Sequence, residues 1–265
     1  MKKILIIGIG AGNPDYLTVQ AITALAQVDV FFIMDKGAAK AKLIALRTHI
    51  IERFARAGHH RVVEATNPER GADNGDYRAA VDQLNQDKQR IFERLIAREM
   101  AQGECGAFLV WGDPALYDST IRIVEAIAKS GRQALEYDVI PGISSVQALT
   151  ARHRIPLNLI GRSIEITNGR TIAAGFPAGI DSVVVMLDAQ DSYLKLADAD
   201  LDIYWGAYLG TPDEILMSGK LVEVGPEIAR VRAAARRTHG WIMDTYLLRK
   251  RDPHDGATVH LTANE

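Results

Sequence analysis

Near the middle of this chain runs Ala107-Phe-Leu-Val-Trp-Gly-Asp-Pro-Ala-Leu-Tyr-Asp-Ser-Thr120. The four apolar residues at its start predict a short buried strand, and the Trp-Gly-Asp-Pro run predicts a sharp turn that leads into a helix. Such a turn places backbone amides and the Asp113 carboxylate at the carboxyl end of a strand, where open α/β sheets bind their ligands. Because the same residues also form ordinary strand-to-helix turns, the stretch indicates a ligand site only together with the rest of the chain.

The amino terminus repeats this strand-turn-helix pattern. Ile4-Leu-Ile-Ile7 predicts a strand buried on both faces, and the apolar spacing from Leu17 to Leu25 predicts a helix with Asp15 as its cap. A second buried strand, from Val28 to Met34, ends at Asp35. The order of strand, glycine-rich loop, helix and acid-terminated strand resembles a dinucleotide-binding unit.

The glycine-rich loop itself departs from the dinucleotide fingerprint. After Gly8 and Gly10 the spacing requires a third glycine at position 13, but Asn13 stands there. Pro14 also interrupts the start of the helix that should face a pyrophosphate. The loop therefore indicates a close approach to backbone, and nicotinamide binding is the less favoured interpretation.

Composition limits the class of protein. The chain has 265 residues and a formal net charge of −2, which allows one large domain or two smaller ones and argues against a nucleic-acid or anionic-membrane partner. The single Cys105 excludes an intrachain disulfide and a cysteine-based metal cluster. No stretch approaches the roughly 18 apolar residues of a transmembrane helix. We therefore expect a soluble cytoplasmic protein.

The chain is polar from Arg47 to Gln89, and we interpret residues 59–76 within it as a long loop with a short helix on either side. A helix with an apolar face from Leu84 to Ile96 is expected to follow. The part of the loop from residue 68 to residue 76 is either a substrate lid or a solvated surface loop. His59 and His60 lack a third ligand at a recognised spacing, so we favour a surface pair and predict no metal site.

The remaining pattern predicts a second α/β domain. A helix from Ile121 to Lys129 and a strand from Leu135 to Ile140 lead into the turn Pro141-Gly-Ile-Ser-Ser145. Ile155-Pro-Leu157 ends the next helix, and we expect two domains, residues 1–156 and 157–265, to meet there. The later expected elements are strands at 164–166, 182–187, 203–209 and 241–248, a turn at 211–214, a basic helix at 222–238 with a solvated charged face, and a partly disordered tail from 249.

Four motifs occur in order: Gly8-x-Gly-x-Gly-x-Pro14, Gly112-Asp-Pro114, Pro141-Gly-Ile-Ser-Ser145 and Thr211-Pro-Asp-Glu214. Together they resemble the tetrapyrrole methylase family over nearly the whole chain. The resemblance implies two α/β domains with a cofactor cleft between them, a homodimer, S-adenosyl-L-methionine as cofactor and S-adenosyl-L-homocysteine as product. The polar insert and Trp111 before Gly-Asp-Pro are most similar to members that act on precorrins in cobalamin biosynthesis.

The resemblance also implies the residues of the site. The expected cofactor-binding residues are Trp111, Gly112, Asp113, Leu116, Tyr117, Ser144, Ser145, Met186, Tyr208, Ile242, Met243 and Thr245. The first loop is expected to face the tetrapyrrole, although many members have proline where Ala11 stands. The expected substrate-binding residues are Gly10, Ala11, Gly12, Lys36 and Arg70, of which the last two are available for carboxylates.

The implied reaction is methyl transfer to C1 of precorrin-5 with release of the C20 acetyl group as acetate. Methyl transfer to an electron-rich carbon depends mainly on positioning, whereas deacetylation requires a general base that activates water. Asp35 and Asp113 are the candidate catalytic residues because both stand at carboxyl ends of strands. Three alternatives stay open: another tetrapyrrole methyltransferase of this fold, a nicotinamide-dependent oxidoreductase, and a non-catalytic tetrapyrrole carrier.

Overall fold

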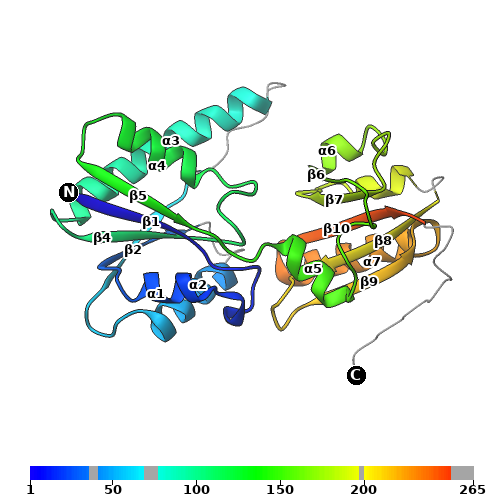
Figure 1. Ribbon diagram of the computed structural model, residues 1–265, viewed down its shortest axis with the longest axis horizontal. Coiled ribbons are helices and arrows are strands. Elements are labelled where there is room, and N and C mark those ends of the chain that lie inside the picture. Colours follow the sequence, from blue (N-terminus) through cyan, green and yellow to red (C-terminus); the bar gives the residue numbers. More distant parts are fainter. Residues whose placement is uncertain (36–40, 69–76, 197–199, 252–265) are drawn as a thin grey trace. The chain divides into compact units, whose positions relative to one another are not determined.

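The structure is a computed structural model that describes residues 1–35, 41–68, 77–196 and 200–251, without the side chains of residues 35, 41 and 77. The chain forms two compact units, Met1–Ser144 and Ser145–Glu265, and both are α/β units as expected (Figure 1). The change of unit comes before α5 (Ser145–His153) rather than after it, because this helix packs on strands of the second sheet. The expected boundary at residue 156 therefore differs from the observed division.

The first unit is a parallel sheet of five strands in the order β3-β2-β4-β1-β5. Helices α1 and α2 cover one face, and α3 and α4 cover the other (Figure 1). The bounds are β1 Lys2–Gly8, α1 Val19–Leu25, β2 Val30–Asp35, α2 Ala41–Phe54, β3 Arg61–Thr66, α3 Tyr77–Glu99, β4 Cys105–Val110, α4 Thr120–Lys129 and β5 Leu135–Ile140.

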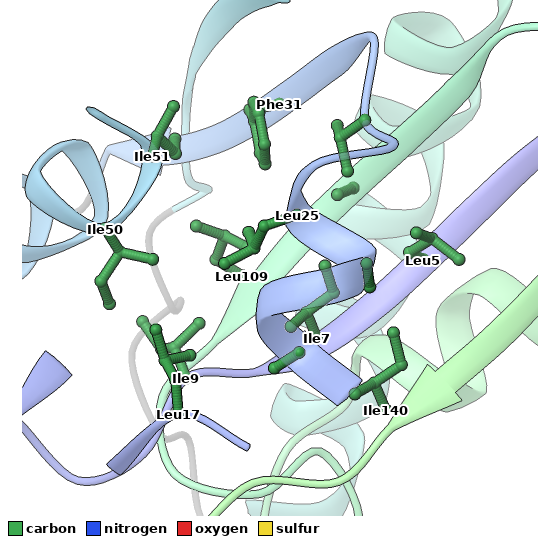
Figure 2. Close-up of a cluster of buried hydrophobic side chains, with 14 of the residues drawn as sticks. Leu5, Ile7, Ile9, Leu17, Leu25, Phe31, Ile50, Ile51, Leu109 and Ile140 are labelled. Carbon is green, nitrogen blue, oxygen red and sulfur yellow. The ribbon is translucent and has the colours of Figure 1, made fainter. Parts of the chain in front are cut away.

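The core of this unit explains the continuous apolar run in β1. Leu5 and Ile7 belong to the core cluster that includes Leu25 of α1 and Ile50 of α2 (Figure 2), whereas Ile4 and Ile6 belong to the cluster beneath α3 and α4. Successive side chains of a strand point to opposite faces, so a strand covered on both sides must be apolar at every position. The predicted buried strands at residues 4–7 and 107–110 are confirmed.

The connections on either side of β4 leave the sheet toward opposite faces. The chain continues from β1 and β2 into helices on one face, and from β4 into α4 on the other. Adjacent strands that continue to opposite faces leave a crevice at their carboxyl ends, which is where ligands bind in such sheets. The pairing of β2 with β4 ends at Phe32 and Phe108, so these two strands separate toward that end.

The second unit is a mixed sheet in the order β6-β7-β10-β8-β9. Its β6 and β7 are parallel, and the other neighbours are antiparallel. Apolar side chains of α6, η3 and α7 share one core cluster with its strands, and α5 contacts β8 and β10. The bounds are β6 Ile164–Asn168, α6 Gly169–Ile172, β7 Ser182–Met186, η3 Ser192–Leu196, β8 Leu201–Ala207, β9 Ile215–Lys220, α7 Leu221–His239 and β10 Asp244–Lys250.

Two strands were absent from the sequence interpretation, and the expected long loop at residues 59–76 contains one of them. The helix expected after that loop is confirmed as α3. β3 lies within the expected loop as an edge strand whose residues are half-buried or exposed, so it lacks the apolar run of a central strand. β9 is also an edge strand without a fully buried residue. Arg249 and Lys250 belong to β10, although we expected the polar tail to begin there.

The cap of the first helix also differs from the prediction. Thr18 caps α1, because its Oγ1 accepts a hydrogen bond of 3.0 Å from the Ala21 amide. Asp15 instead lies in a short 3₁₀ turn, η1 (Pro14–Tyr16), which begins at Pro14 and is capped by Asn13. Pro14 therefore starts a turn of its own and does not break α1.

Candidate functional site

Three strand ends of the first unit meet backbone to backbone, and glycine allows the approach. Gly8 ends β1, Gly112 follows β4 and Gly142 follows β5. A Cβ atom on Gly142 would lie 2.1 Å from the Gly112 carbonyl oxygen, and one on Gly8 would lie 2.6 Å from the Gly142 nitrogen. Side chains cannot occupy these distances, so the glycines are required for the three loops to meet.

The glycine-rich first loop pairs with the loop after β4. The Gly112 amide donates to the Gly10 carbonyl oxygen over 2.8 Å, and the Gly10 amide donates to the Gly112 carbonyl oxygen over 3.2 Å. Both glycines have positive φ, +78° and +69° respectively. The structure therefore brings together Gly10, Ala11 and Gly12, expected at the substrate, and Gly112, expected at the cofactor. Ala11 is buried, so any ligand contact of this loop involves mainly backbone.

Asp113 joins two of these loops. Its Oδ2 accepts a hydrogen bond of 2.9 Å from the Gly142 amide, and its Oδ1 accepts one of 2.8 Å from the Ala115 amide. A carboxylate that accepts two backbone amides is a strong link between chain segments. These contacts give Asp113 a positioning role, and its expected role as general base stays a prediction.

The turn after β4 also contains an unsatisfied donor. The indole Nε1 of Trp111 is buried and has no hydrogen-bond partner in the described part of the chain. A buried donor without an acceptor costs about 1–3 kcal/mol, which a ligand that accepts the bond removes. Ser144 lies beside the next residue, Gly112, with its Cα 3.7 Å from where a Cβ of Gly112 would stand. The unsatisfied Trp111 donor therefore fits a ligand that offers a hydrogen-bond acceptor.

The expected cofactor residues of the second unit gather at one end of its sheet. Thr245 of β10 stands opposite Met186 of β7, and the Thr245 hydroxyl donates to the Ser145 hydroxyl over 3.0 Å. The Tyr208 amide donates to the Met243 carbonyl oxygen over 2.9 Å, and Ile242 is half-buried beside the core. These residues are up to 100 positions apart in the sequence, and they meet at the ends of β7, β8 and β10.

Several non-glycine residues near both sets of strand ends adopt the left-handed region. They include Tyr117 in the turn after β4, Leu187 directly after β7 and Tyr208 directly after β8, with φ of +54°, +55° and +50°. Leu187 is 67% exposed, which is unusual for leucine in any conformation. Such strained residues cluster at ligand sites, and here they follow the strands that carry the expected site residues.

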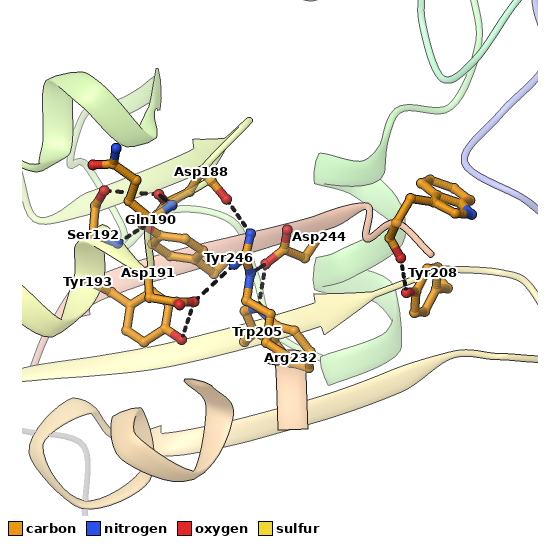
Figure 3. Close-up of polar contacts among 11 residues, drawn as sticks. Asp188, Gln190, Asp191, Ser192, Tyr193, Trp205, Tyr208, Arg232, Asp244 and Tyr246 are labelled. Atoms are coloured by element: carbon orange, nitrogen blue, oxygen red, sulfur yellow. Dashed lines mark hydrogen bonds and ion pairs between the residues drawn. The ribbon is translucent and has the colours of Figure 1, made fainter. Parts of the chain in front are cut away.

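A buried polar network supports the end of β7 (Figure 3). Arg232 of α7 is only 5% exposed, and its Nε donates to Asp244 Oδ2 over 2.8 Å. Its guanidinium also donates to the Asp188 carbonyl oxygen and forms an ion pair of 3.3 Å with Asp191. Trp205 Nε1 donates to the same Asp244 oxygen over 2.9 Å. Our expectation that the arginines of this helix form a solvated face is therefore wrong for Arg232.

The same network fixes Asp188, two residues after Met186. Asp188 Oδ2 accepts hydrogen bonds from the Tyr246 hydroxyl and the Ser192 amide, each of 2.7 Å (Figure 3). Burial raises the pKa of the Tyr246 phenol, and the Asp188 charge adds to that rise. Burial also raises the pKa of Asp244, against the effect of Arg232. The sequence could not reveal this network because its members are far apart along the chain.

Glu214 explains the Thr211-Pro-Asp-Glu214 motif after β8. Its Oε2 accepts a hydrogen bond of 2.8 Å from the Gly210 amide, and its Oε1 accepts one of 2.6 Å from Arg152 Nε of α5. The motif closes the loop that follows Tyr208 and ties it to α5.

Other sequence predictions have different outcomes. Lys36, Arg70, the Asp35 side chain and most of the expected lid at 68–76 lie outside the described residues. His59 is exposed, and Nδ1 of His60 lies 3.0 Å from the Arg56 carbonyl oxygen. Within the described part of the chain, no group of three potential metal ligands occurs and no helix has the length and apolarity to span a membrane.

The two α/β sheets and the glycine-mediated meeting of the strand-end loops define a two-unit α/β protein. A sequence model of the Tetrapyrrole (Corrin/Porphyrin) Methylases matches residues 3–225. The chain belongs to this family.

Individual relatives narrow the comparison. A precorrin-6A synthase [deacetylating] of Sinorhizobium sp is 52% identical over 250 residues, which cover 94% of this chain and 96% of the relative. The crystal structure of a cobalamin synthesis related protein, CobF, from Corynebacterium diphtheriae has a TM-score of 0.81 at 36% identity and covers 95% of this chain and all of that one. A uroporphyrin-III C-methyltransferase from Thermus thermophilus, solved with S-adenosyl homocysteine, shares the fold at a TM-score of 0.59 and 15% identity, over 93% and 92% of the two chains.

Proposed function

We propose that this chain is a precorrin-6A synthase of the deacetylating kind, which converts precorrin-5 to precorrin-6A in aerobic cobalamin biosynthesis. The observation that carries this proposal is the 52% identity to the Sinorhizobium enzyme over 94% of the chain. The 250 aligned residues cover 94% of the chain and therefore span both units. The reaction adds a methyl group to C1 and releases the C20 acetyl group as acetate.

The proposed cofactor is S-adenosyl-L-methionine, which when bound supplies an electrophilic methyl group on a sulfonium. Membership in a methylase family and the unsatisfied indole N–H of Trp111 support it. The residues that would hold it in the first unit are Trp111, Gly112, Asp113, Leu116, Tyr117 and Ser144. Those in the second unit are Ser145, Met186, Tyr208, Ile242, Met243 and Thr245.

The residues of this chain act mainly by positioning. The Gly10–Gly112 pairing and the Asp113–Gly142 hydrogen bond hold three loops in one arrangement, and such fixed loops would orient a bound cofactor and substrate toward one another. Lys36 and Arg70 are proposed to bind substrate carboxylates. For the activation of water, Asp35 at the end of β2 is the stronger of the two candidate bases, because both oxygens of Asp113 already accept backbone amides.

The finer properties of the family are also proposals here. We infer that the enzyme is a cytoplasmic homodimer, as the family resemblance implies. Light scattering of the purified chain, with and without S-adenosylhomocysteine, would measure the oligomeric state directly.

Two experiments test the function in sequence. Calorimetric titration with S-adenosylhomocysteine, with NAD and NADP as parallel controls, should show one saturable site per chain for the first compound only. Incubation with precorrin-5 and labelled S-adenosylmethionine should then yield labelled tetrapyrrole and acetate in equal amounts. Methyl gain without acetate release would instead support another tetrapyrrole methyltransferase. Binding of NAD would support an oxidoreductase. Binding of the tetrapyrrole without turnover would support a carrier.

A further inference from the structure

Arg47 of α2 lies at the point where β2 and β4 separate. Its Nε donates a hydrogen bond of 3.0 Å to the Leu109 carbonyl oxygen, and its Nη1 donates one of 3.0 Å to the Leu43 carbonyl oxygen. The last paired residues of the two strands are Phe32 and Phe108, so Leu109 is the first residue of β4 without a partner on β2. Arg47 therefore donates a hydrogen bond to the Leu109 carbonyl oxygen, which lies beyond the last residue of β4 that pairs with β2.

This structural role does not require a positive charge. The residue is only 9% exposed, and no ion pair to it occurs among the described side chains. Burial lowers the pKa of Arg47 to about 10, although the Asp118 charge opposes the shift, so the guanidinium is charged at neutral pH. A buried cation without a paired anion is costly, and a neutral amide donor would satisfy Leu109 at a smaller cost.

The guanidinium also retains hydrogen-bonding capacity. It has five N–H donors, and the two contacts described above leave its Nη2 group without an acceptor in the described part of the chain. The planar arrangement of these donors matches the two oxygens of a carboxylate. Ligands of such sheets bind at the carboxyl ends of diverging strands, and Arg47 bonds to β4 just beyond its last pair with β2.

We propose that Arg47 binds a carboxylate side chain of the tetrapyrrole at the carboxyl ends of β2 and β4. This inference rests on the proposed function, because it takes a precorrin with several carboxylate side chains as the ligand. Arg47 then orients the macrocycle beside the loop that follows β4, and it does not take part in bond making or breaking. Its loss should weaken substrate binding and leave cofactor binding intact.

The test compares R47Q and R47K with a control on the same helix. Arg53 of α2 is exposed and pairs with Asp15 over 3.1 Å, so R53Q removes an arginine charge from the surface. For each variant we would measure KM and kcat for precorrin-5, the Kd for S-adenosylhomocysteine and the melting temperature. R47Q should raise KM about tenfold or more, as the loss of a charged hydrogen-bond pair predicts. Its Kd for S-adenosylhomocysteine should stay within about twofold of the wild-type value.

R47K keeps the positive charge but loses the planar pair of donors, so its KM should lie between those of the wild type and R47Q. The KM of R53Q should match that of the wild type. An unchanged KM in R47Q, with or without a lower melting temperature, would overturn the proposal and leave Arg47 as a structural donor to Leu109. Should R47Q fail to fold, R47K decides: a raised KM supports the proposal, and a wild-type KM contradicts it. Absence of methyl transfer and acetate release in the wild type would instead defeat the proposed function, which is a distinguishable failure.

Discussion

Asp113 and Gly142 are joined by a hydrogen bond of 2.9 Å, in which the Gly142 amide donates to Asp113 Oδ2. Asp113 stands in the turn after β4 and Gly142 in the turn after β5, on either side of the end of β1. The bond connects two motifs that are separate in the sequence, Gly-Asp-Pro and Pro-Gly-Ile-Ser-Ser. The same aspartate that marks the first motif thus determines the position of the second.

Substitution D113N should weaken this link. The amide of asparagine can accept one of the two backbone hydrogen bonds through its oxygen, but its NH₂ group meets the other backbone N–H as a second donor. We expect a loss of about 1.5–3 kcal/mol in unfolding free energy and about tenfold weaker binding of S-adenosylhomocysteine. Urea unfolding and calorimetry measure the two quantities.

D138N is the matched control for D113N, because Asp138 of β5 is exposed and pairs with Lys3 on the surface. It should leave both quantities nearly unchanged. If D113N kept wild-type stability and cofactor affinity but lost acetate release alone, Asp113 would be the general base and our positioning role for it would be wrong.

Substitution G142A should be among the most damaging single-methyl additions in the first unit. The new Cβ would stand 2.1 Å from the Gly112 carbonyl oxygen, and that atom belongs to backbone that cannot move without displacing β4. We expect a loss of about 3 kcal/mol or more in unfolding free energy and no detectable methyl transfer. Thermal and urea unfolding provide the measurement.

G225A serves as the comparison. Gly225 lies inside α7 directly before Pro226, and apart from its chain neighbours the nearest atom to an added Cβ would be 3.4 Å away, so alanine should cost only the modest strain of a helical residue that precedes proline. Equal stability of G142A and G225A would contradict the close backbone approach described here.

Substitution R232M should break the network of the second unit. It leaves Asp244 and Asp191 without their cation, and removal of one partner of a buried ion pair typically costs about 3–5 kcal/mol. Because the Arg232 guanidinium also bonds the Asp188 carbonyl oxygen, the segment after Met186 should loosen and cofactor affinity should fall. Urea unfolding and titration with S-adenosylhomocysteine measure these effects.

W205F also changes this network, since it removes the indole donor to Asp244 and leaves a cavity where the fully buried indole stood. It should cost about 1 kcal/mol for the hydrogen bond and about 1 kcal/mol more for the cavity. A loss in R232M no greater than that in W205F would show that the ion pair contributes little to stability.

Glu104, in the loop before β4, should make the stability of the protein depend on pH in the acid range. Hydrogen bonds from Arg61 and the Ala101 amide lower the pKa of Glu104 to about 2 from its ordinary 4.5. A depressed carboxyl pKa contributes stability that is present above the unfolded-state pKa and is lost as pH falls toward the folded-state value. The melting-temperature difference between wild type and E104Q should therefore be constant near neutral pH and shrink from about pH 4.5 to about pH 2.

The Arg61–Glu104 pair is partly exposed, so the expected difference is small, a few degrees at most. Replacement of the exposed Glu125, which pairs with Lys129 on one helix, should give a smaller difference at every pH. If the difference in melting temperature between the wild type and E104Q did not change with pH, ionisation of Glu104 could not be its cause.

Several strands and turns could be predicted because their signals are local. An uninterrupted apolar run such as Ile4 to Ile7 requires burial on both faces, and Gly, Pro and Asp mark turns wherever they stand. The strand from Leu135 to Ile140 was predicted with its observed bounds. Edge strands β3 and β9 were not predicted, because a strand with one unpaired, exposed edge needs no continuous apolar pattern.

In the candidate site, too, some residues could be predicted from local sequence and others could not. The sequence by itself determined the glycines and the aspartate of the strand-end motifs, since only particular residue types permit those turns. Only the tertiary structure decided which backbone atoms these residues meet, that Arg232 is buried against Asp244, and that Arg47 lies at the diverging ends of β2 and β4. The physical reason is that a charged side chain has the same local pattern whether water or protein surrounds it, and its surroundings depend on residues far away along the chain.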